Sequence, residues 1–566
     1  MYKRSHSFHL VPVLATFCSA LFLCSTLAAC TFGQQSAESS IESSSIAEVS
    51  SVAATSVSSA AESLRDSSAP SSAEEAPPTK PDRTDIEITN AIMSNFAKLA
   101  AIPRQSGNEA QVSEYLRNWA EGHGYTVTKD DANNIIFDVP ATRGHEDQPL
   151  VGLQAHMDMV CAADGSIAYN PSTDAIEVIR DDASDTVTAE GTSLGADDGI
   201  GIAIIMDIAN DNIAHGPLRV ILTTDEEGDM TGVKAIDPDF ITDLSYLINL
   251  DGEMATAVVM SSAGYETLVA TSSLDFIVPV GDTAATVTLD GLLGGNASQY
   301  IGEGRCNAAR EMASFINYLT ESKIEYELSS ITAGTSENTI PDSASATIVF
   351  KSEDADTISI LVNTYKAALD DAYEGLETDI SMSMRTVKVP EWAMTSESAG
   401  KVLDYALNVF DGAYTMSPNM EGIVESSSNL GMLNANSDDG FSALILVRSL
   451  DNSGFDDIED LHISTVTDHG CDLTIGERSS DWSYNDESKL LDLAKKVYHD
   501  NNGSDIKVEV SSMALECGVF ANMNPDLDII RIGPDIANMN TPDETLRLGS
   551  IPVVYHLVEG ILSDID

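Results

Sequence analysis

The sequence predicts an α/β protein in which a mostly parallel sheet is flanked by helices and an α+β segment is inserted into the chain. Strand-like apolar runs alternate with helix-like segments from about residue 86 to residue 262, which is the pattern of a parallel sheet covered by helices. After about Ala263 strands and helices still alternate, but acidic and imidazole side chains no longer follow the strands. At 566 residues the chain is longer than one core usually serves, so we expect two domains.

Local signals predict the individual elements. Apolar spacing favours helices over residues 86–101, which Pro103 closes, and over residues 109–121. The run YTVTKDDANNIIFDVP indicates a hairpin. Buried strands are expected at residues 150–154, 218–223 and 246–250, and helices at residues 193–211, 307–320, 356–373 and 488–498. The run LDIIRIGP is expected to be the last strand, before a closing helix over residues 545–562.

Acidic and imidazole side chains gather just past the apolar runs of the first domain. Three of these runs end at such residues, and the segment over residues 193–211, which opens with a glycine-rich turn and continues as a helix, carries two more in that turn. The set is His156, Asp158, Asp197, Asp198, Glu226, Glu227 and Asp251. Open α/β sheets bind ligands at the carboxyl ends of their strands. Imidazole nitrogen and carboxylate oxygen suit divalent metals, and a pair of ions needs a bridging carboxylate. Any single acid is equally well explained as a solvated loop residue, but the set together predicts a metal site.

Spacing within the set suggests different roles for neighbouring residues. His156 and Asp158 are two apart on an extended segment and point to the same side, which suits a metal ligand and the carboxylate that orients it. Glu226 and Glu227 are adjacent and diverge in an extended chain. One of them can therefore face a metal while the other stays free to act as a base.

At these residues the chain resembles the aminoacyl-histidine dipeptidases, also called cytosolic non-specific dipeptidases, within the di-zinc aminopeptidase-like hydrolases. The matching pieces are QAHMDMV, GTSLGADDGIG, HGPL followed by TTDEEGDMTG, and NLDGE, and then GLLGGNASQYIGEGRCNA, SENTIP, VRSL, LECGVF, IGP and TPDE. The resemblance runs from about Glu87 to the C-terminus. It implies a metallopeptidase catalytic domain formed by residues 86–262 and 481–566, and a lid domain, residues 263–480, that contacts the substrate.

The resemblance also implies a function and its residues. The expected activity is that of a zinc-dependent dipeptidase acting on short peptides with free termini. One zinc ion would bind His156, Asp197 and Asp251, and a second would bind Asp197, Glu227 and Asn540. Glu226 would take a proton from the attacking water and give it to the leaving amine, while Asp158 would hold His156.

The lid motifs supply the expected substrate contacts. Arg448 would grip a carboxylate, Asn338 would donate a hydrogen bond near the scissile carbonyl, and Asn296 lies at a third substrate position. A surface ion pair within an acidic lid is the alternative explanation of Arg448.

Three positions depart from the pattern of the family. The resemblance implies a metal-ligating histidine at Asn540, a substrate-contacting histidine at Asn296 and a further histidine at Ser512. An amide oxygen is a poorer zinc donor than imidazole, so we expect the second ion to be weakly bound, exchanged for a harder ion or absent, and the activity to be low. The alternatives are a catalytically impaired peptide-binding lipoprotein that retains the peptidase fold, and a hydrolase of altered substrate preference.

The N-terminal composition predicts export and anchoring. Lys3 and Arg4 precede an apolar run, and Leu27-Ala28-Ala29-Cys30 resembles a bacterial lipoprotein box, so residues 1–29 would be a signal peptide and Cys30 would carry lipid. An ordinary secretory signal is the alternative. Residues 30–85, rich in Ser, Ala, Glu and Pro, would form a disordered tether. The expected location is extracytoplasmic, with the protein lipid-anchored to the cell membrane.

The charge balance limits the possible partners. The chain carries 90 acidic and 29 basic residues, a formal net charge of −61. Such a surplus argues against nucleic-acid binding through a basic face. The expected partners are a short peptide substrate and a lipid anchor, and a homodimer is left open.

Overall fold

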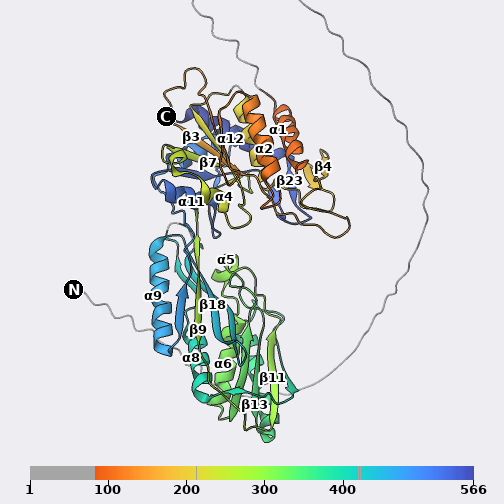
Figure 1. Ribbon diagram of the computed structural model, residues 1–566, viewed down its shortest axis with the longest axis vertical. Coiled ribbons are helices and arrows are strands. Elements are labelled where there is room, and N and C mark those ends of the chain that lie inside the picture. The colour runs from red at the N-terminus through yellow and green to blue at the C-terminus, as the bar shows by residue number, and fades with distance from the viewer. Residues whose placement is uncertain (1–82, 212, 419, 421) are drawn as a thin grey trace, which may run out of the picture. The chain divides into compact units, whose positions relative to one another are not determined.

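The computed structural model describes residues 83–211, 213–418, 420 and 422–566 (Figure 1). The predicted signal peptide, the lipidation site at Cys30 and almost all of the predicted tether lie outside these residues. Among the described residues, none of the helices combines the length and apolar character needed to cross a membrane.

The first large sheet has eight strands and is mostly parallel, as the sequence predicts. Its order is β1 (Val127–Lys129), β2 (Ile135–Val139), β6 (Leu218–Thr223), β3 (Val151–His156), β7 (Tyr246–Asn249), β21 (Asp528–Arg531), β8 (Ala257–Ser262) and β20 (Lys507–Ser511). The neighbouring strands β6, β3, β7 and β21 are paired in parallel, and β8 is paired in parallel with β20. The hairpin β1–β2 joins the edge of β6 in antiparallel fashion.

Helices cover both faces of this sheet, which the alternation of buried side chains explains. On β2, Ile135 and Phe137 belong to one apolar core while Ile136 belongs to another, because successive side chains of a strand point to opposite faces. The first core includes side chains from α1 (Asp85–Ala100), α2 (Ala110–Gly122), α3 (Ala196–Asn210), α10 (Lys489–Asn502) and α12 (Ile551–Asp564). The second core includes side chains from α4 (Thr231–Ala235) and α11 (Glu516–Met523).

The register of the parallel strands brings the site residues to one edge of the sheet. His156 at the end of β3 is paired with Thr223 at the end of β6. On the other side of β3, Gln154 is paired with Asn249 of β7, and Asn249 is paired in turn with Arg531 of β21. The loops that follow β3, β6 and β7 therefore leave the sheet side by side, as expected for the carboxyl ends of parallel strands.

The second large sheet is antiparallel and is built from the inserted part of the chain. Its strands are, in spatial order, β14 (Ser381–Val387), β11 (Thr283–Asp290), β13 (Ala344–Phe350), β12 (Tyr326–Ala333), β17 (Val424–Asn436), β18 (Gly440–Ser449), β9 (Gly264–Ser272) and β19 (Asp472–Ile475), and β16 (Gly412–Met416) pairs with β17. Its apolar core includes side chains from α6 (Ala308–Glu321), α7 (Ala355–Ala372), α8 (Ser396–Asn408) and α9 (Asn452–His469). Figure 1 shows α9 alongside β18, with which it is in contact.

Short elements complete the fold. A four-stranded sheet contains β22 (Ile536–Ala537), β23 (Thr545–Arg547), β5 (Thr186–Ala189) and β4 (Val178–Asp181), and β10 (Phe276–Ile277) pairs with β15 (Ala393–Met394). The remaining helices are α5 (Ala297–Tyr300) and the 3-10 turns η1 (Pro238–Phe240), η2 (Ile301–Glu303), η3 (Ser352–Asp354) and η4 (Leu548–Ser550).

The predicted C-terminal elements are partly wrong. The run LDIIRIGP forms β21 but is not the last strand, because β22 and β23 follow it. Thr545–Arg547 is a strand that pairs with β5 through Leu546 and Val187, and the closing helix begins only at Ile551. Pro552 then lies in the first turn, where its missing N–H is tolerated; a helix from residue 545 would have carried it in the interior.

Candidate metal centre

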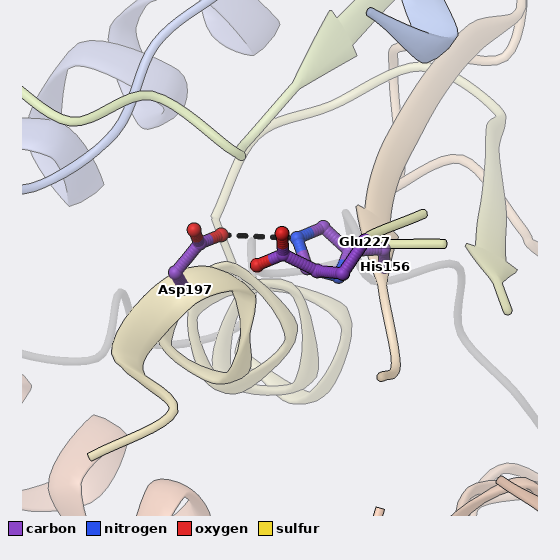
Figure 2. A group of neighbouring side chains, drawn as sticks. All are labelled: His156, Asp197 and Glu227. Atoms are coloured by element: carbon purple, nitrogen blue, oxygen red, sulfur yellow. Dashed lines mark hydrogen bonds and ion pairs between the residues drawn. The ribbon is translucent and has the colours of Figure 1, made fainter. Parts of the chain in front are cut away.

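The candidate site lies at the edge of the eight-stranded sheet where the strands end. His156 is the last residue of β3, Asp197 lies at the start of α3, and Asp251 follows β7. Glu226 and Glu227 lie in the loop after β6. Figure 2 shows the side chains of His156, Asp197 and Glu227 directed toward one another from these separate segments.

His156 is the buried centre of the cluster. Its Nε2 atom lies 3.0 Å from Oδ1 of Asp197 and 3.5 Å from Oδ1 of Asp251, and its Nδ1 atom lies 3.4 Å from Oδ1 of Asp158. Burial alone would lower the pKa of His156, but the three carboxylates together raise that pKa well above its ordinary value. An imidazole held between carboxylates in this way is the arrangement found around metal-ligating histidines.

Asp158 contacts both His156 and the loop that carries Glu226 and Glu227. Its carboxylate accepts hydrogen bonds from Oγ of Ser106 at 2.8 Å, from the backbone N–H of Glu226 at 3.0 Å and from that of Glu227 at 3.1 Å. Burial alone would raise the pKa of Asp158, but His156 and these hydrogen bonds hold that pKa at about 2. Asp158 is therefore ionised, and it ties the loop after β6 to the end of β3.

Asp197 and Asp198 are adjacent but do different things. Asp197 faces Nε2 of His156, as the sequence predicts for a ligand. Asp198 is buried, and it accepts hydrogen bonds from the backbone N–H groups of His156 at 3.2 Å and Gly201 at 3.1 Å. Asp198 thus joins the first turn of α3 to β3.

Glu544 holds the turn that presents Asp197, a role that sequence reasoning missed. Its carboxylate accepts hydrogen bonds from the backbone N–H groups of four successive residues at 2.8–3.3 Å: Leu194, Gly195, Ala196 and Asp197. Gly195 has φ 69°, and a Cβ atom there would lie 2.6 Å from the guanidinium of Arg104. The TPDE run of the sequence contains Glu544, but nothing local to that run identifies its partners about 350 residues earlier.

Glu226 and Glu227 are both desolvated. Burial raises the pKa of Glu226 well above its ordinary value. Burial, followed by the nearby carboxylate of Asp197, raises the pKa of Glu227 to about 8. Oε2 of Glu227 accepts a hydrogen bond from Nδ2 of Asn540 at 3.0 Å, while its Oε1 is buried without a hydrogen-bond partner among the described residues. The amide donor of Asn540, rather than its oxygen, therefore faces this carboxylate.

A buried arginine lies next to Asp251 and was not identified from the sequence. Nε and Nη2 of Arg531 both lie 3.2 Å from Oδ2 of Asp251, and Nη2 lies 3.5 Å from Oε1 of Glu253. Burial alone would raise the pKa of Asp251, but the charge of Arg531 and the contact with His156 hold that pKa far below its usual range. The available signal was a single arginine within the apolar run LDIIRIGP.

Glu516 is a further buried acid near the cluster. Its Oε2 accepts hydrogen bonds from Nε2 of Gln154 at 2.6 Å and from Oγ1 of Thr223 at 2.8 Å, and its Oε1 is buried without a partner among the described residues. Burial raises the pKa of Glu516 to about 8. The LECGVF run contains this residue, although sequence reasoning gave it no role.

The residues of the cluster fit a divalent cation. Two sets of donors have ligand atoms that all lie within 4.8 Å of one another: His156 with Asp197 and Glu227, and His156 with Asp198 and Asp251. The unpartnered Oε1 of Glu227 belongs to the first set. Imidazole nitrogen with carboxylate oxygens is a donor set for zinc and similar ions, and a cation would offset the repulsion among these buried acids.

The three predicted substrate residues, Asn296, Asn338 and Arg448, make their hydrogen bonds with residues outside the cluster around His156. Oδ1 of Asn296 caps α5 by accepting from the backbone N–H of Ser298 at 2.9 Å and from its hydroxyl at 2.7 Å. Arg448 donates from Nη1 to the backbone oxygen of Ser512 at 2.8 Å and from Nη2 to Oδ1 of Asn338 at 3.3 Å. No hydrogen bond joins these three side chains to His156 or its carboxylates within the described part of the chain.

Comparison with known proteins identifies the family. Residues 152–564 match the model of peptidase family M20/M25/M40. The chain belongs to this family of peptidases. Metal-dependent hydrolysis of peptides is general to this family, and the clustered donors around His156 agree with it.

The matches to two individual relatives cover most of the chain. The cytosol non-specific dipeptidase of Escherichia coli K12 is 30% identical over 472 residues, which are 83% of this chain and 96% of the relative. The crystal structure of aminoacylhistidine dipeptidase from Vibrio alginolyticus matches with a TM-score of 0.78 and 29% identity, over 84% of this chain and 96% of that one. The fold class predicted from the sequence is confirmed by this match.

The predicted extracytoplasmic, lipid-anchored location is wrong. The E. coli relative that covers 83% of the chain is a cytosol enzyme by name, and the prediction is contradicted on that ground. The expectation rested on Lys3, Arg4, the apolar run after them and the box-like Leu27-Ala28-Ala29-Cys30. That pattern is a signal of local composition, and it is independent of the residues that form the peptidase fold.

Proposed function

We propose that this protein is a metal-dependent dipeptidase that hydrolyses short peptides with free termini. The observation that carries the proposal is the convergence on the buried His156 of carboxylates from separate loops at one sheet edge. The names of two relatives support the substrate class: a non-specific dipeptidase at 30% identity and an aminoacylhistidine dipeptidase at 29% identity.

We assign one or two zinc ions to this cluster, the first to His156, Asp197 and Asp251 and the second to Asp197, Glu227 and Asn540. Bound zinc would polarise the scissile carbonyl and stabilise the negative charge that develops on its oxygen. The short distances from Nε2 of His156 to Asp197 and Asp251 support the first position. The orientation of Asn540, whose amide donor faces Glu227, supports our expectation that the second position is weak and the activity low.

Glu226 is proposed as the general base. A desolvated carboxylate has a raised proton affinity, so it can take a proton from the attacking water and pass it to the leaving amine nitrogen. Its backbone N–H donates to Asp158, which also contacts His156. We therefore propose that Asp158 holds both the general base Glu226 and the metal ligand His156 in position for the same reaction.

The proposed lid, residues 263–480, supplies the substrate contacts, and residues 86–262 with 481–566 form the proposed catalytic domain. Arg448 would bind the substrate carboxylate: its Nε is buried without a hydrogen-bond partner among the described residues, and its guanidinium makes no ion pair there. Asn338 uses its Oδ1 for Arg448, which leaves its Nδ2 as a donor for the scissile carbonyl. Asn296 keeps its proposed substrate position through the amide nitrogen, since its Oδ1 caps α5.

Replacement of Glu226 by glutamine tests the function directly. This change keeps the shape of the side chain and removes the base, so dipeptide hydrolysis by the zinc-loaded protein should fall by roughly 100- to 10,000-fold. Calorimetry with the same dipeptide should show unchanged binding, because the base contributes to the reaction and not to affinity. Equal hydrolysis by both forms would exclude Glu226 as the base. Tight dipeptide binding without turnover in the unchanged protein would favour a peptide-binding protein.

A further inference from the structure

Arg531 occupies an unusual position for a cation. It is the last residue of β21, and its side chain is only 9% exposed. The parallel pairing of Asn249 with Arg531 sets the guanidinium beside the loop that follows β7. There it contacts Asp251, which is a proposed metal ligand, and Glu253. The contact is therefore fixed by the central strands of the sheet and is not a chance surface pair.

The geometry of this contact divides the two oxygens of Asp251. Both Nε and Nη2 of Arg531 donate toward Oδ2. The other oxygen, Oδ1, faces Nε2 of His156 at 3.5 Å. Arg531 therefore binds Oδ2 of Asp251, while Oδ1 remains directed toward His156.

A guanidinium keeps its positive charge at every physiological pH and cannot leave the protein. In a site where carboxylates are desolvated, a fixed positive charge repels a further divalent cation. It also lowers the repulsion among the carboxylates, so less is gained when a divalent cation neutralises them. A second feature acts in the same direction, because Asn540 offers Glu227 a neutral amide. Arg531 thus offsets part of the negative charge of the whole cluster, whose Asp197 is shared by both proposed ions. The position at Glu227 and Asn540 has a weaker ligand than imidazole, so the ion at that position is the one expected to bind weakly.

We propose that Arg531 is an internal cation that supplies part of the charge of a second metal ion, so that this centre binds one divalent ion tightly and the second weakly. The inference rests on the proposed metal centre and goes beyond it by naming the residue that sets the number of ions. It concerns the charge of Arg531. A lysine at this position should therefore act like the arginine, although it cannot reproduce the two-donor geometry.

The test is zinc binding by the full chain with residue 531 changed. The proteins are the unchanged chain, Arg531→Gln and Arg531→Lys, each stripped of metal, titrated with zinc in a calorimeter and assayed for bound zinc by mass spectrometry. We expect one tight ion in the unchanged protein and in Arg531→Lys. In Arg531→Gln the second ion should bind at least about tenfold more tightly, the order expected when a unit charge is removed from a partly desolvated site.

A matched control is Arg219→Gln. The side chain of Arg219 is 10% exposed and pairs with Asp138 and Asp243. It lies near the start of β6, at the opposite end of that strand from the cluster. Loss of these two ion pairs should lower the melting temperature without changing the zinc stoichiometry or the affinity for the second ion.

A second readout is the melting temperature, measured first on the metal-free proteins. Without metal, Arg531→Gln leaves Asp251 and Glu253 without their cation, so its melting temperature should lie below that of the unchanged protein. Added zinc should raise the melting temperature of Arg531→Gln more than that of Arg219→Gln. If Arg531→Gln does not fold, the titration of the unchanged protein still decides, because two equally tight ions would overturn the inference.

The remaining outcomes separate this inference from the proposed function. Arg531→Gln with the zinc stoichiometry and affinities of the unchanged protein would refute the role of Arg531 alone. No bound zinc in any of the proteins would refute the metal centre as well. Dipeptide hydrolysis is measured separately, so a protein with one tight zinc ion and no hydrolysis would refute the dipeptidase proposal and leave the role of Arg531 standing.

Discussion

The amide nitrogen of Asn540 donates a hydrogen bond to Oε2 of Glu227 over 3.0 Å, across 313 positions of the chain. A donor therefore faces the carboxylate where a metal-ligating residue would turn an acceptor toward the ion. Asn540 has φ 61°, a left-handed conformation that histidine also tolerates better than most residues. The position can thus accept an imidazole without a change in the backbone.

Asn540→His should strengthen the second metal position. The imidazole would add a true ligand, so the affinity for the second zinc ion should rise by more than the roughly 10- to 100-fold typical of groups that only orient ligands. Dipeptide hydrolysis should rise with it, measured as kcat at saturating zinc. Asn538→His is the matched control, since Asn538 lies in the same loop and donates to the backbone of Asp543. Hydrolysis by the unchanged protein at about 1 to 1000 per second, with no gain in Asn540→His, would show that Asn540 does not limit the reaction.

Glu544→Gln should loosen the turn that presents Asp197. The glutamine amide can accept only some of the four hydrogen bonds and brings its own N–H groups against the backbone donors. Because hydrogen bonds to a charged acceptor contribute about 1.5–3 kcal/mol each, we expect a loss on the order of 3 kcal/mol in the free energy of unfolding by urea, together with weaker zinc binding. Glu559→Gln, at a half-exposed glutamate of α12, should cost less than about 0.5 kcal/mol. Equal effects of the two changes would contradict this role.

Glu516 should make the metal-free protein less stable as the pH rises. Its pKa is raised to about 8 in the folded state from an ordinary value of 4.5, so the folded state holds the proton more tightly than the unfolded state. The resulting stability is present below pH 4.5 and is lost as the pH rises toward 8, with a slope of up to about 1.4 kcal/mol per pH unit. Glu516→Gln mimics the protonated form, and its unfolding free energy should fall less steeply between pH 5 and 8. Parallel curves for the two proteins would exclude Glu516 as the titrating group.

Arg448→Ala should weaken the binding of dipeptides with a free C-terminus. Loss of a charge-assisted hydrogen bond costs about 1.5–3 kcal/mol, so the Kd measured by calorimetry should rise by about tenfold or more. The same dipeptide with an amidated C-terminus is the control ligand, because it lacks the carboxylate that Arg448 is proposed to bind. An equal loss for both ligands would mean that Arg448 acts through its bond to the Ser512 backbone and not through the substrate.

The sequence predicted those parts of the site that depend on local geometry. His156 and Asp158 could be assigned to one side because side chains two apart on an extended segment share a face, and their contact agrees with that interpretation. Asp251 could be expected near them because the carboxyl ends of parallel strands meet at one edge. The closing helix was predicted too early although Pro552 carried the signal for its start.

The missed residues act through partners that are distant in the sequence. Glu544 binds backbone groups 347–350 positions away, and backbone donors have no sequence signature. Arg531 could be noticed as a charge within an apolar run, but its partner Asp251 lies 280 positions earlier, and no periodicity links the two. The proposed domain boundaries, the proposed ligand set and the possible homodimer stay predictions.

The position of β21 has a consequence for how the chain is made. β21 lies between β7 and β8, yet it is synthesised 265 residues or more after both, at Asp528–Arg531. Until then an emerging chain holds β7 and β8 without the strand that joins them, and unpaired strand edges are prone to association with other chains. Ribosome-bound chains that end before residue 528 should therefore be sensitive to protease and unable to bind zinc tightly. The enzyme would thus acquire its metal only when synthesis is almost complete.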